Sequence, residues 1–442
     1  MRKIRGVSRR ALIQTVSIAG VLATAPAAAA DVHIHAAFKA RSYRPGQIAA
    51  LRIFDSPSRS LTLDLFDAVA LRDRALTAAE VRPTWKIRLH GRAPWTVYMR
   101  MGHWRSGVYL VRLATHRGVI GYATLVLRPL YLGAHRTLVV EPTNTWEAYN
   151  FWGGDSWYKN KLIWKVDLSR PYAGVGLPPH FAAYDLGFLR WVEANGATAD
   201  FISDDDLDRF LSGKQLRRLY DLVVFPGHEE YVTGHVYDVV QSYRNRGGNL
   251  IYLSANSFFW RILHHGSTMI GRTRWDHLGR PESALVGAAY HGWESHLYKN
   301  HPYIVVGAHR LRWLFAGTGL ENGDAFGNYG IEIDQRNKFS PTRTAVAARI
   351  ANVFGRGHSA EMTYYRRGHA QVFDAGVLNF GGGVSAWPAA GAMLRNLWRH
   401  FGGHLPPAEP LVAAESGGES HLHGAAGAAV GAGLGQRDDA LR

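Results

Sequence analysis

Two polar residues stand out in a loop that directly follows a short apolar run. The run DLVVF at 221–225 is followed by PGHEEY, in which His228 and Glu230 are two positions apart. In an extended loop this spacing can place both side chains on one side of the chain. Such a pair suits acid–base catalysis or metal binding, although it also occurs by chance in polar loops. Its position after a predicted strand favours a functional role.

A second loop is unusually rich in aromatic residues. The run TLVVE at 137–141 is followed by PTNTWEAYNFWGGDSWY, which contains three tryptophans and two tyrosines. These are Trp146, Tyr149, Trp152, Trp157 and Tyr158. Taken alone, the residues favour a hydrophobic cluster beneath a long loop. The alternative is a ligand pocket in which one phenol binds a metal or donates a hydrogen bond.

The two loops can meet only if the strands before them end close together. Residues 133–403 have a sequence pattern that predicts such a fold. Short apolar runs alternate there with amphipathic segments, which predicts an α/β domain with a mostly parallel sheet covered on both faces. Ser203 followed by three aspartates fits a helix start. Ligands bind outside the carboxyl ends of the strands in such sheets. The polar and aromatic loops are therefore expected to meet at one edge.

The flanking regions have different compositions. Residues 31–132 contain short strand-like runs separated by Gly, Pro, Ser and Asp, which predicts an Ig-like β-sandwich. Residues 404–442 are rich in Gly and Ala and cannot bury enough apolar surface to fold, so we expect a disordered tail there. The fold class is thus α/β plus β.

Residues 1–30 have the three zones of a secretory signal. A basic segment containing Ser8-Arg9-Arg10-Ala11-Leu12 precedes a mildly apolar stretch that ends in small residues at Ala30. The paired arginines favour the twin-arginine route over an ordinary secretory signal. Later segments lack the ~18 consecutive apolar residues that a membrane span needs. We expect an exported protein, periplasmic or extracellular, without an integral membrane segment after cleavage.

Composition excludes some chemistry. The chain has no cysteine, which rules out thiol nucleophiles and cysteine-bound metals. Its formal net charge is +16, but the basic residues are scattered and form no recognisable nucleic-acid-binding module. We therefore expect no nucleic-acid partner and interpret the charge as a surface facing an anionic cell envelope.

Several ordered motifs together resemble one enzyme family. They are WRSGVY (104–109), TWEAYNFWGG (145–154), FLRWVEANG (188–196), DDDL (204–207), PGHEEY (226–231) and FAGTGL (315–320). The set is similar to the large (beta) subunit family of N,N-dimethylformamidase, with gaps, from about residue 40 to 400. The resemblance implies an amidotransferase-like α/β domain joined to β-rich modules. It also implies hydrolysis of a small formamide at a mononuclear ferric site.

The resemblance implies that two tyrosinates and one glutamate hold the iron. By motif, these are Tyr109, Tyr149 and Glu230, with His228 as the acid–base residue. Phenolate and carboxylate are hard oxygen donors that suit a trivalent ion, although another metal is possible. A tyrosine has an ordinary pKa of ~10 and needs an adjacent cation to ionise. Glu361 is a candidate to orient His228, and the alternative is an ordinary surface carboxylate.

Tyr109 has an alternative of its own, because a strand tyrosine usually belongs to a core. Val232 and Thr233 replace the Trp and Ser that often follow GHxEY in the family. The characterised enzyme also has a small subunit.

The sequence thus predicts an exported, metal-dependent hydrolase of a carbon–nitrogen bond, acting on a small-molecule amide, with a homo-oligomer possible. The alternative function is a non-catalytic protein that binds envelope glycan. A glycosidase would need two carboxylates that flank a cleft, and Glu229 and Glu230 are adjacent.

Overall fold

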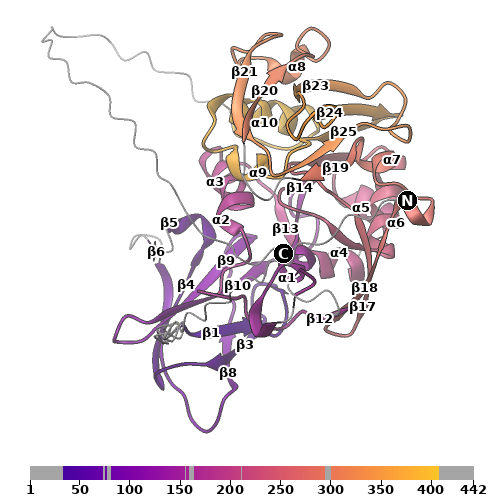
Figure 1. The fold of residues 1–442 in the computed structure, drawn as a ribbon. Helices are drawn as coiled ribbons and strands as arrows, with labels where there is room; N and C mark the ends of the chain where they lie inside the picture. Colours follow the sequence, from indigo (N-terminus) through magenta and orange to yellow (C-terminus); the bar gives the residue numbers. More distant parts are fainter. Residues whose placement is uncertain are drawn as a thin grey trace, which may run out of the picture. The chain divides into compact units, whose positions relative to one another are not determined.

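The computed structural model describes residues 33–72, 75–76, 81–154, 156–158, 164–210, 212–293 and 300–407 (Figure 1). The predicted signal peptide lies outside these ranges, as does the predicted tail beyond residue 407. No helix among the described residues combines the length and the apolar character needed to span a bilayer.

The N-terminal part consists of two main sheets. One has the order β1-β3-β8 and the other the order β2-β10-β9-β4-β7. The strands are β1 (His35–Phe38), β2 (Ser42–Tyr43), β3 (Ile48–Asp55), β4 (Ser60–Asp67), β7 (Val81–Arg88), β8 (Trp95–Arg100), β9 (Gly107–Ala114) and β10 (Ile120–Leu127); η1 (Ala68–Ala70), β5 (Leu71–Arg72) and β6 (Ala75–Leu76) follow β4. Apolar side chains from both sheets form one core. The strands and turns were predictable, and the Ig-like assignment remains a prediction.

The second part is built on a nine-stranded sheet in the order β13-β11-β14-β16-β25-β24-β23-β20-β21. Its strands are β11 (Thr137–Glu141), β13 (Asp200–Ser203), β14 (Leu222–Phe225), β16 (Asn249–Tyr252), β20 (His301–Val305), β21 (Ala325–Tyr329), β23 (Ala345–Ile350), β24 (Ala360–Arg367) and β25 (Ala370–Asp374). The first five in this order pair in parallel and the remaining pairs are antiparallel. The prediction of a mostly parallel sheet is therefore correct only for its first half. The amidotransferase-like assignment remains a prediction.

Helices cover both faces of the parallel half. On one face α4, α5 and α6 pack against strand residues such as Leu138, Val223 and Leu250. On the other face α3 and α10 pack against the alternate residues Val139 and Val224. The helices are α1 (Thr143–Ala148), α2 (Phe181–Tyr184), α3 (Leu186–Ala194), α4 (Asp204–Phe210), α5 (Gly213–Leu219), α6 (Gly234–Asn245), α7 (Ser283–Val286), α8 (Arg312–Phe315), α9 (Phe380–Gly383) and α10 (Pro388–His400), with short 3-10 turns η3 (Trp152–Gly154) and η4 (Asp276–Leu278).

Two smaller sheets accompany the main sheet. One has the order β12-β18-β17-β15 and the other pairs β19 with β22. Their strands are β12 (Lys165–Asp167), β15 (Tyr231–Thr233), β17 (Trp260–His265), β18 (Thr268–Arg274), β19 (Ala289–Trp293) and β22 (Glu332–Gln335). β15 begins a few residues after β14 ends, so the PGHEE loop runs from the main sheet into a smaller one. That loop is thereby fixed at both ends.

Strand β9 is buried on both sides. Tyr109 and Val111 face the sandwich core, whereas Val108 and Leu110 join the core that contains α3 and α10. One strand of the sandwich thus contributes alternate residues to two cores.

Candidate active site

Tyr149, Tyr158 and Glu230 meet through their side-chain oxygens. The Tyr149 hydroxyl donates to Glu230 Oε2 at 2.8 Å, and the Tyr158 hydroxyl lies 3.1 Å from the same oxygen. The two phenol rings stack with centroids 4.1 Å apart. The Tyr158 hydroxyl also lies 2.5 Å from the Tyr231 hydroxyl. Two phenols and one carboxylate therefore converge on one point.

Local backbone contacts hold these residues in place. Tyr149 caps the C-terminus of α1, and the Thr145 hydroxyl in the same helix accepts from the backbone N–H of Glu230 at 3.1 Å and of Tyr231 at 3.3 Å. The Trp260 N–H donates to the Glu230 carbonyl at 2.9 Å. The helix and the PGHEEY loop are thus tied together beside the reactive oxygens.

Gly227 allows the loop to pass close to its neighbours. A Cβ at this position would lie 2.2 Å from an Asp185 carboxylate oxygen and 3.1 Å from the Pro142 ring. Such separations are far below van der Waals contact, so a larger residue would displace the loop that carries His228 and Glu230.

His228 lies between two carboxylates. Its Nε2 is 3.4 Å from Glu332 Oε2 and 3.6 Å from Glu230 Oε2, and the rings of Tyr149 and Tyr184 lie beside it. All three polar side chains are buried or nearly so. Nε2 and Glu332 Oε2 make no well-formed hydrogen bond at this spacing. The imidazole is therefore positioned by charge, beside the Tyr149–Glu230 contact.

Burial and crowding of negative groups shift the pKa values of the site. Burial raises the pKa of Glu230 to about 7, opposed by the charge of His228 and supported by that of Glu332. Burial and then Glu230 raise the pKa values of Tyr149 and Tyr158 well above the ordinary value. Burial alone would lower the pKa of His228, but Glu332 and Glu230 outweigh it and raise that pKa. Without a nearby cation, the phenols stay protonated.

The donor set fits a hard cation. Two phenol oxygens lie within hydrogen-bond distance of one carboxylate oxygen, and the protons that join them are the ones a trivalent ion would replace. Within the described ranges, no group of three or more His, Asp or Glu side chains could hold a metal ion. The set of two phenols and one carboxylate differs from such a group, because two of its three oxygen donors come from tyrosines.

The structure places the other two sequence candidates elsewhere. Tyr109 belongs to the sandwich core, where its hydroxyl donates to the Arg105 carbonyl at 3.0 Å. The Glu361 carboxylate accepts from Arg336 at 2.9 Å and from Arg349 at 2.5 Å. Glu332, rather than Glu361, is the carboxylate beside His228.

Two residues of the site were not predicted from the sequence as site residues. Tyr158 was named only as one of the aromatic residues in the loop that also contains Tyr149. Glu332 lies on β22, in a region without a clear pattern, and gave no signal.

Glu229 faces the opposite direction from its neighbours. Both of its carboxylate oxygens are buried, as are both oxygens of Glu141, and the carboxyl groups of Glu229 and Asp204 are hydrogen-bonded to each other. Burial, and then the negative charge of Asp204, raise the pKa of Glu229 well above its ordinary value. Glu229 and Glu230 therefore belong to separate clusters, which removes the paired arrangement that a glycosidase needs.

Comparison with known proteins gives consistent matches to one group. A family profile described as "N,N-dimethylformamidase beta subunit-like, C-terminal" matches residues 72–392. The N,N-dimethylformamidase beta subunit of Paracoccus aminophilus is 24% identical over 206 residues, which is 45% of this chain and 26% of the relative. The namesake subunit from Alcaligenes sp is 33% identical over 81 residues, covering 18% of this chain and 10% of the relative. The matched segments thus span about a quarter or less of those relatives.

Among solved structures, the N-terminal domain of mmIFT52 aligns with 60% of this chain and 96% of that chain. The sequence identity is 10% and the TM-score is 0.33.

Proposed function

Since the chain belongs to the N,N-dimethylformamidase beta subunit-like family, we propose that it hydrolyses a carbon–nitrogen bond in a small amide, with Tyr149, Tyr158 and Glu230 at the reaction centre. The observation that carries this proposal is the meeting of two phenol hydroxyls on one buried carboxylate oxygen. His228 stands beside this group and supplies a proton-transfer residue.

The cofactor we propose is a mononuclear ferric ion held by these three residues. A ferric ion bound there would supply a Lewis acid for the amide carbonyl and for water. Tyr149, Tyr158 and Glu230 would hold the ion through three anionic oxygens, and the two phenol protons would be released to solvent when it binds. This assignment replaces Tyr109 by Tyr158, because the Tyr109 hydroxyl is bonded within the sandwich.

The residues around the centre handle protons and exclude water. His228 Nε2 can accept a proton from a water molecule bound near Glu230 and later deliver it to the leaving amine. Glu332 stabilises the imidazolium form of His228 by its charge. The rings of Tyr184 and Tyr149 pack against His228 and shield it from bulk solvent.

Metal analysis and visible absorption of three single variants test the centre. We expect wild-type protein to contain iron and to be coloured by ferric phenolate, and Tyr149→Phe and Tyr158→Phe to lose both. Tyr109→Phe is the matched control, because it removes a buried phenol hydroxyl from the sandwich. Loss of iron in Tyr109→Phe but not in Tyr158→Phe would restore Tyr109 as the ligand. A colourless, iron-free and active wild type would overturn the ferric centre.

The reaction itself is tested with a panel of small amides that includes N,N-dimethylformamide and other formamides. We expect release of an amine and a carboxylic acid in equal amounts, abolished in Tyr158→Phe and retained in Tyr109→Phe. No hydrolysis of any member by iron-loaded wild type would count against an amidohydrolase of this class.

We also propose export by the twin-arginine route, supported by the paired Arg9 and Arg10. Cell fractionation tests it. The double variant Arg9→Lys/Arg10→Lys should stay in the cytoplasm, and the control Arg2→Lys/Arg5→Lys should be exported. Export of both variants would contradict the route.

We also propose that the chain assembles into an oligomer, with a homo-oligomer as the form to test, since both relatives are named as subunits. Light scattering of the purified protein should give a multiple of the mass of one chain. A single-chain mass would contradict it.

A further inference from the structure

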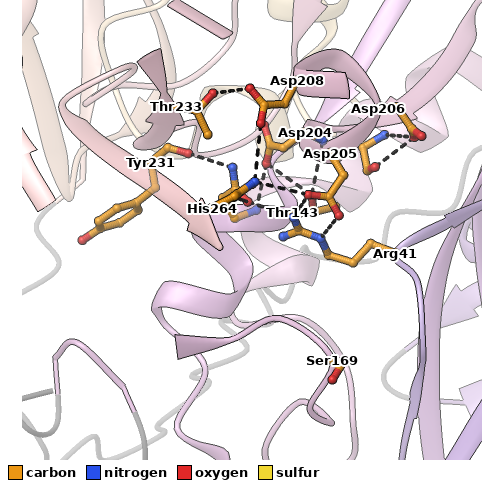
Figure 2. Close-up of polar contacts among 12 residues, drawn as sticks. Arg41, Thr143, Ser169, Asp204, Asp205, Asp206, Asp208, Tyr231, Thr233 and His264 are labelled. Atoms are coloured by element: carbon orange, nitrogen blue, oxygen red, sulfur yellow. Dashed lines mark hydrogen bonds and ion pairs between the residues drawn. The ribbon is translucent and has the colours of Figure 1, made fainter. Parts of the chain in front are cut away.

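A buried arginine connects the sandwich to the second part of the molecule. Arg41 lies between β1 and β2, and its side chain is only 7% exposed. It donates to both oxygens of Asp205, at 3.0 and 2.5 Å (Figure 2). It also donates to Asn144 Oδ1 at 2.9 Å. Burying a guanidinium is costly unless it is fully paired. A buried arginine at this place therefore points to a role in the structure that an exposed surface arginine would not have.

Asn144 is the centre of this network. It is fully buried in the first turn of α1, and its backbone N–H donates to Asp204 Oδ2 at 2.8 Å. Its Oδ1 accepts from Arg41 and lies 3.1 Å from His264 Nε2. Because the Arg41 guanidinium can only donate, the amide is oriented with Oδ1 towards Arg41, and Nδ2 donates to the Tyr231 carbonyl at 3.2 Å.

Asn144 is connected to the candidate active site in two ways, through helix α1 and through Tyr231. α1 carries Tyr149 at its C-terminus, and Tyr231 follows Glu230 in the chain. The Tyr231 hydroxyl contacts that of Tyr158. A change in the orientation of Asn144 would therefore alter how α1 sits against the loop that carries Glu230.

From these contacts we infer that Arg41 is a positioning residue: through Asn144 it fixes α1 against the PGHEEY loop, so the sandwich helps to form the active site. The inference rests on the proposed function. It also explains the DDDL motif, because Asp204 accepts from Asn144, Asp205 pairs with Arg41, Asp206 pairs with Arg128, and Leu207 is fully buried.

Arg128 provides a matched control. It also belongs to the sandwich and pairs with the next carboxylate of α4, Asp206, at 2.9 Å. Asp206 in turn accepts from the N–H and hydroxyl of Ser203 at the start of α4. This second pair joins the same two parts of the molecule, and through Asp206 it is connected to Ser203 at the start of α4.

The test compares Arg41→Lys with Arg128→Lys in the full chain. Both variants keep the positive charge and lose a guanidinium contact. Arg41→Lys loses the two-pronged contact with Asp205, and Arg128→Lys loses the single contact with Asp206. In the iron-loaded protein we expect Arg41→Lys to weaken iron binding and to lower kcat by about a hundredfold, as a small misplacement of reacting groups can. KM should change little. Arg128→Lys should keep the wild-type kcat and iron content, even if its melting temperature falls as far as that of Arg41→Lys.

Hydrogen–deuterium exchange of the metal-free proteins gives a measurement that does not depend on activity. Arg41→Lys should raise exchange in residues 143–149 and 226–233 above wild type, and Arg128→Lys should not. Equal exchange in the two variants would overturn the inference, even if the enzyme is active. Raised exchange in Arg41→Lys alone would support the inference, even if the wild type hydrolyses no amide.

Two further variants test the inference if Arg41→Lys does not fold, or if Arg41 and Asn144 affect the site independently. Asp205→Asn weakens the Arg41 contact with little change in volume and should reproduce the exchange pattern if Arg41→Lys does not fold. Asn144→Ala should reproduce it as well, and the double variant Arg41→Lys/Asn144→Ala should add nothing further, because both act through one contact. Additive effects of the two changes would contradict a shared path.

Discussion

At the scale of single residues, the carboxylate beside His228 decides how that imidazole is used. Glu332 Oε2 is 3.4 Å from Nε2, whereas the Glu361 carboxylate is taken by Arg336 and Arg349. The two glutamates are thus expected to have different roles, one in proton transfer and one in holding strands and loops together.

We expect Glu332→Gln to keep iron and colour but to lower kcat by about 10²–10⁴-fold, the range of general acid–base contributions. Glu361→Gln should instead lower thermal stability, because two arginines lose their shared partner. Steady-state kinetics and melting curves of both variants separate these roles. A larger loss of kcat in Glu361→Gln than in Glu332→Gln would reverse the assignment.

The candidate site was predictable from sequence where its residues lie in compact motifs. His228, Glu230 and Tyr149 were found because each lies in a motif that follows a short apolar run. Tyr109 was preferred over Tyr158 because it lies in a motif of the resemblance, and the sequence does not show which of the two hydroxyls faces Glu230. Glu332 comes from a distant strand, and the pairing of β19 with β22 that positions it has no local signal.

At the scale of elements, two glycines near His228, one before it and one after β15, have opposite surroundings. A Cβ on Gly227 would lie 2.2 Å from an Asp185 carboxylate oxygen, whereas one on Gly234, at the start of α6, would meet only Arg261 at 3.6 Å. The same substitution is thus expected to have different consequences at the two positions.

We expect Gly227→Ala to destabilise the protein by about 1–3 kcal/mol, the usual cost of overpacking. Gly234→Ala should be neutral or slightly stabilising, because alanine favours a helix more than glycine does. Urea unfolding of the two variants measures the difference. Equal stability of both would mean that the loop can move without cost.

The start of α7 offers a prediction about pH. Burial raises the pKa of Glu282 to about 7 from an ordinary value of 4.5, with Asp276 adding to the shift. The folded protein therefore holds a proton that the unfolded chain releases between these pH values, so stability from this group falls as pH rises from about 4.5 to about 7.

Glu282→Gln removes that titration. Above pH 7 the variant should gain up to about 3 kcal/mol of unfolding free energy relative to wild type, following the size of the shift. Below pH 4.5 the two proteins should be equally stable. Denaturant curves across this range test it, and a difference that does not depend on pH would assign the effect to packing.

The sheet shows where pattern-based prediction of elements ends. Residues up to the end of β16 alternate strands with punctuated helices, and that half is parallel as predicted. Beyond it, β20, β21, β23 and β24 are joined without long helices, and they pair antiparallel. Their apolar runs resemble those of buried parallel strands, so direction could not be read from them.

At the scale of the whole molecule, the two parts share a core through β9. Leu110 is fully buried among residues of the core that contains α3 and α10. We expect calorimetry of the protein to show that the sandwich and the second part unfold together in one transition. Leu110→Ala should cost about 2–5 kcal/mol and still give one transition. Two separate transitions would show that the shared core does not couple the parts.

Strand β9 also bears on how such a protein can be cut and recombined. Its residues are apolar on both sides, so a fragment that starts after the sandwich would expose to water the apolar surface that Val108 and Leu110 cover. A sandwich produced alone would expose Val108 and Leu110 themselves. Both fragments would expose apolar surface and would tend to aggregate. Transfer of the sandwich to another enzyme would therefore require that the new partner has an apolar surface of the same shape.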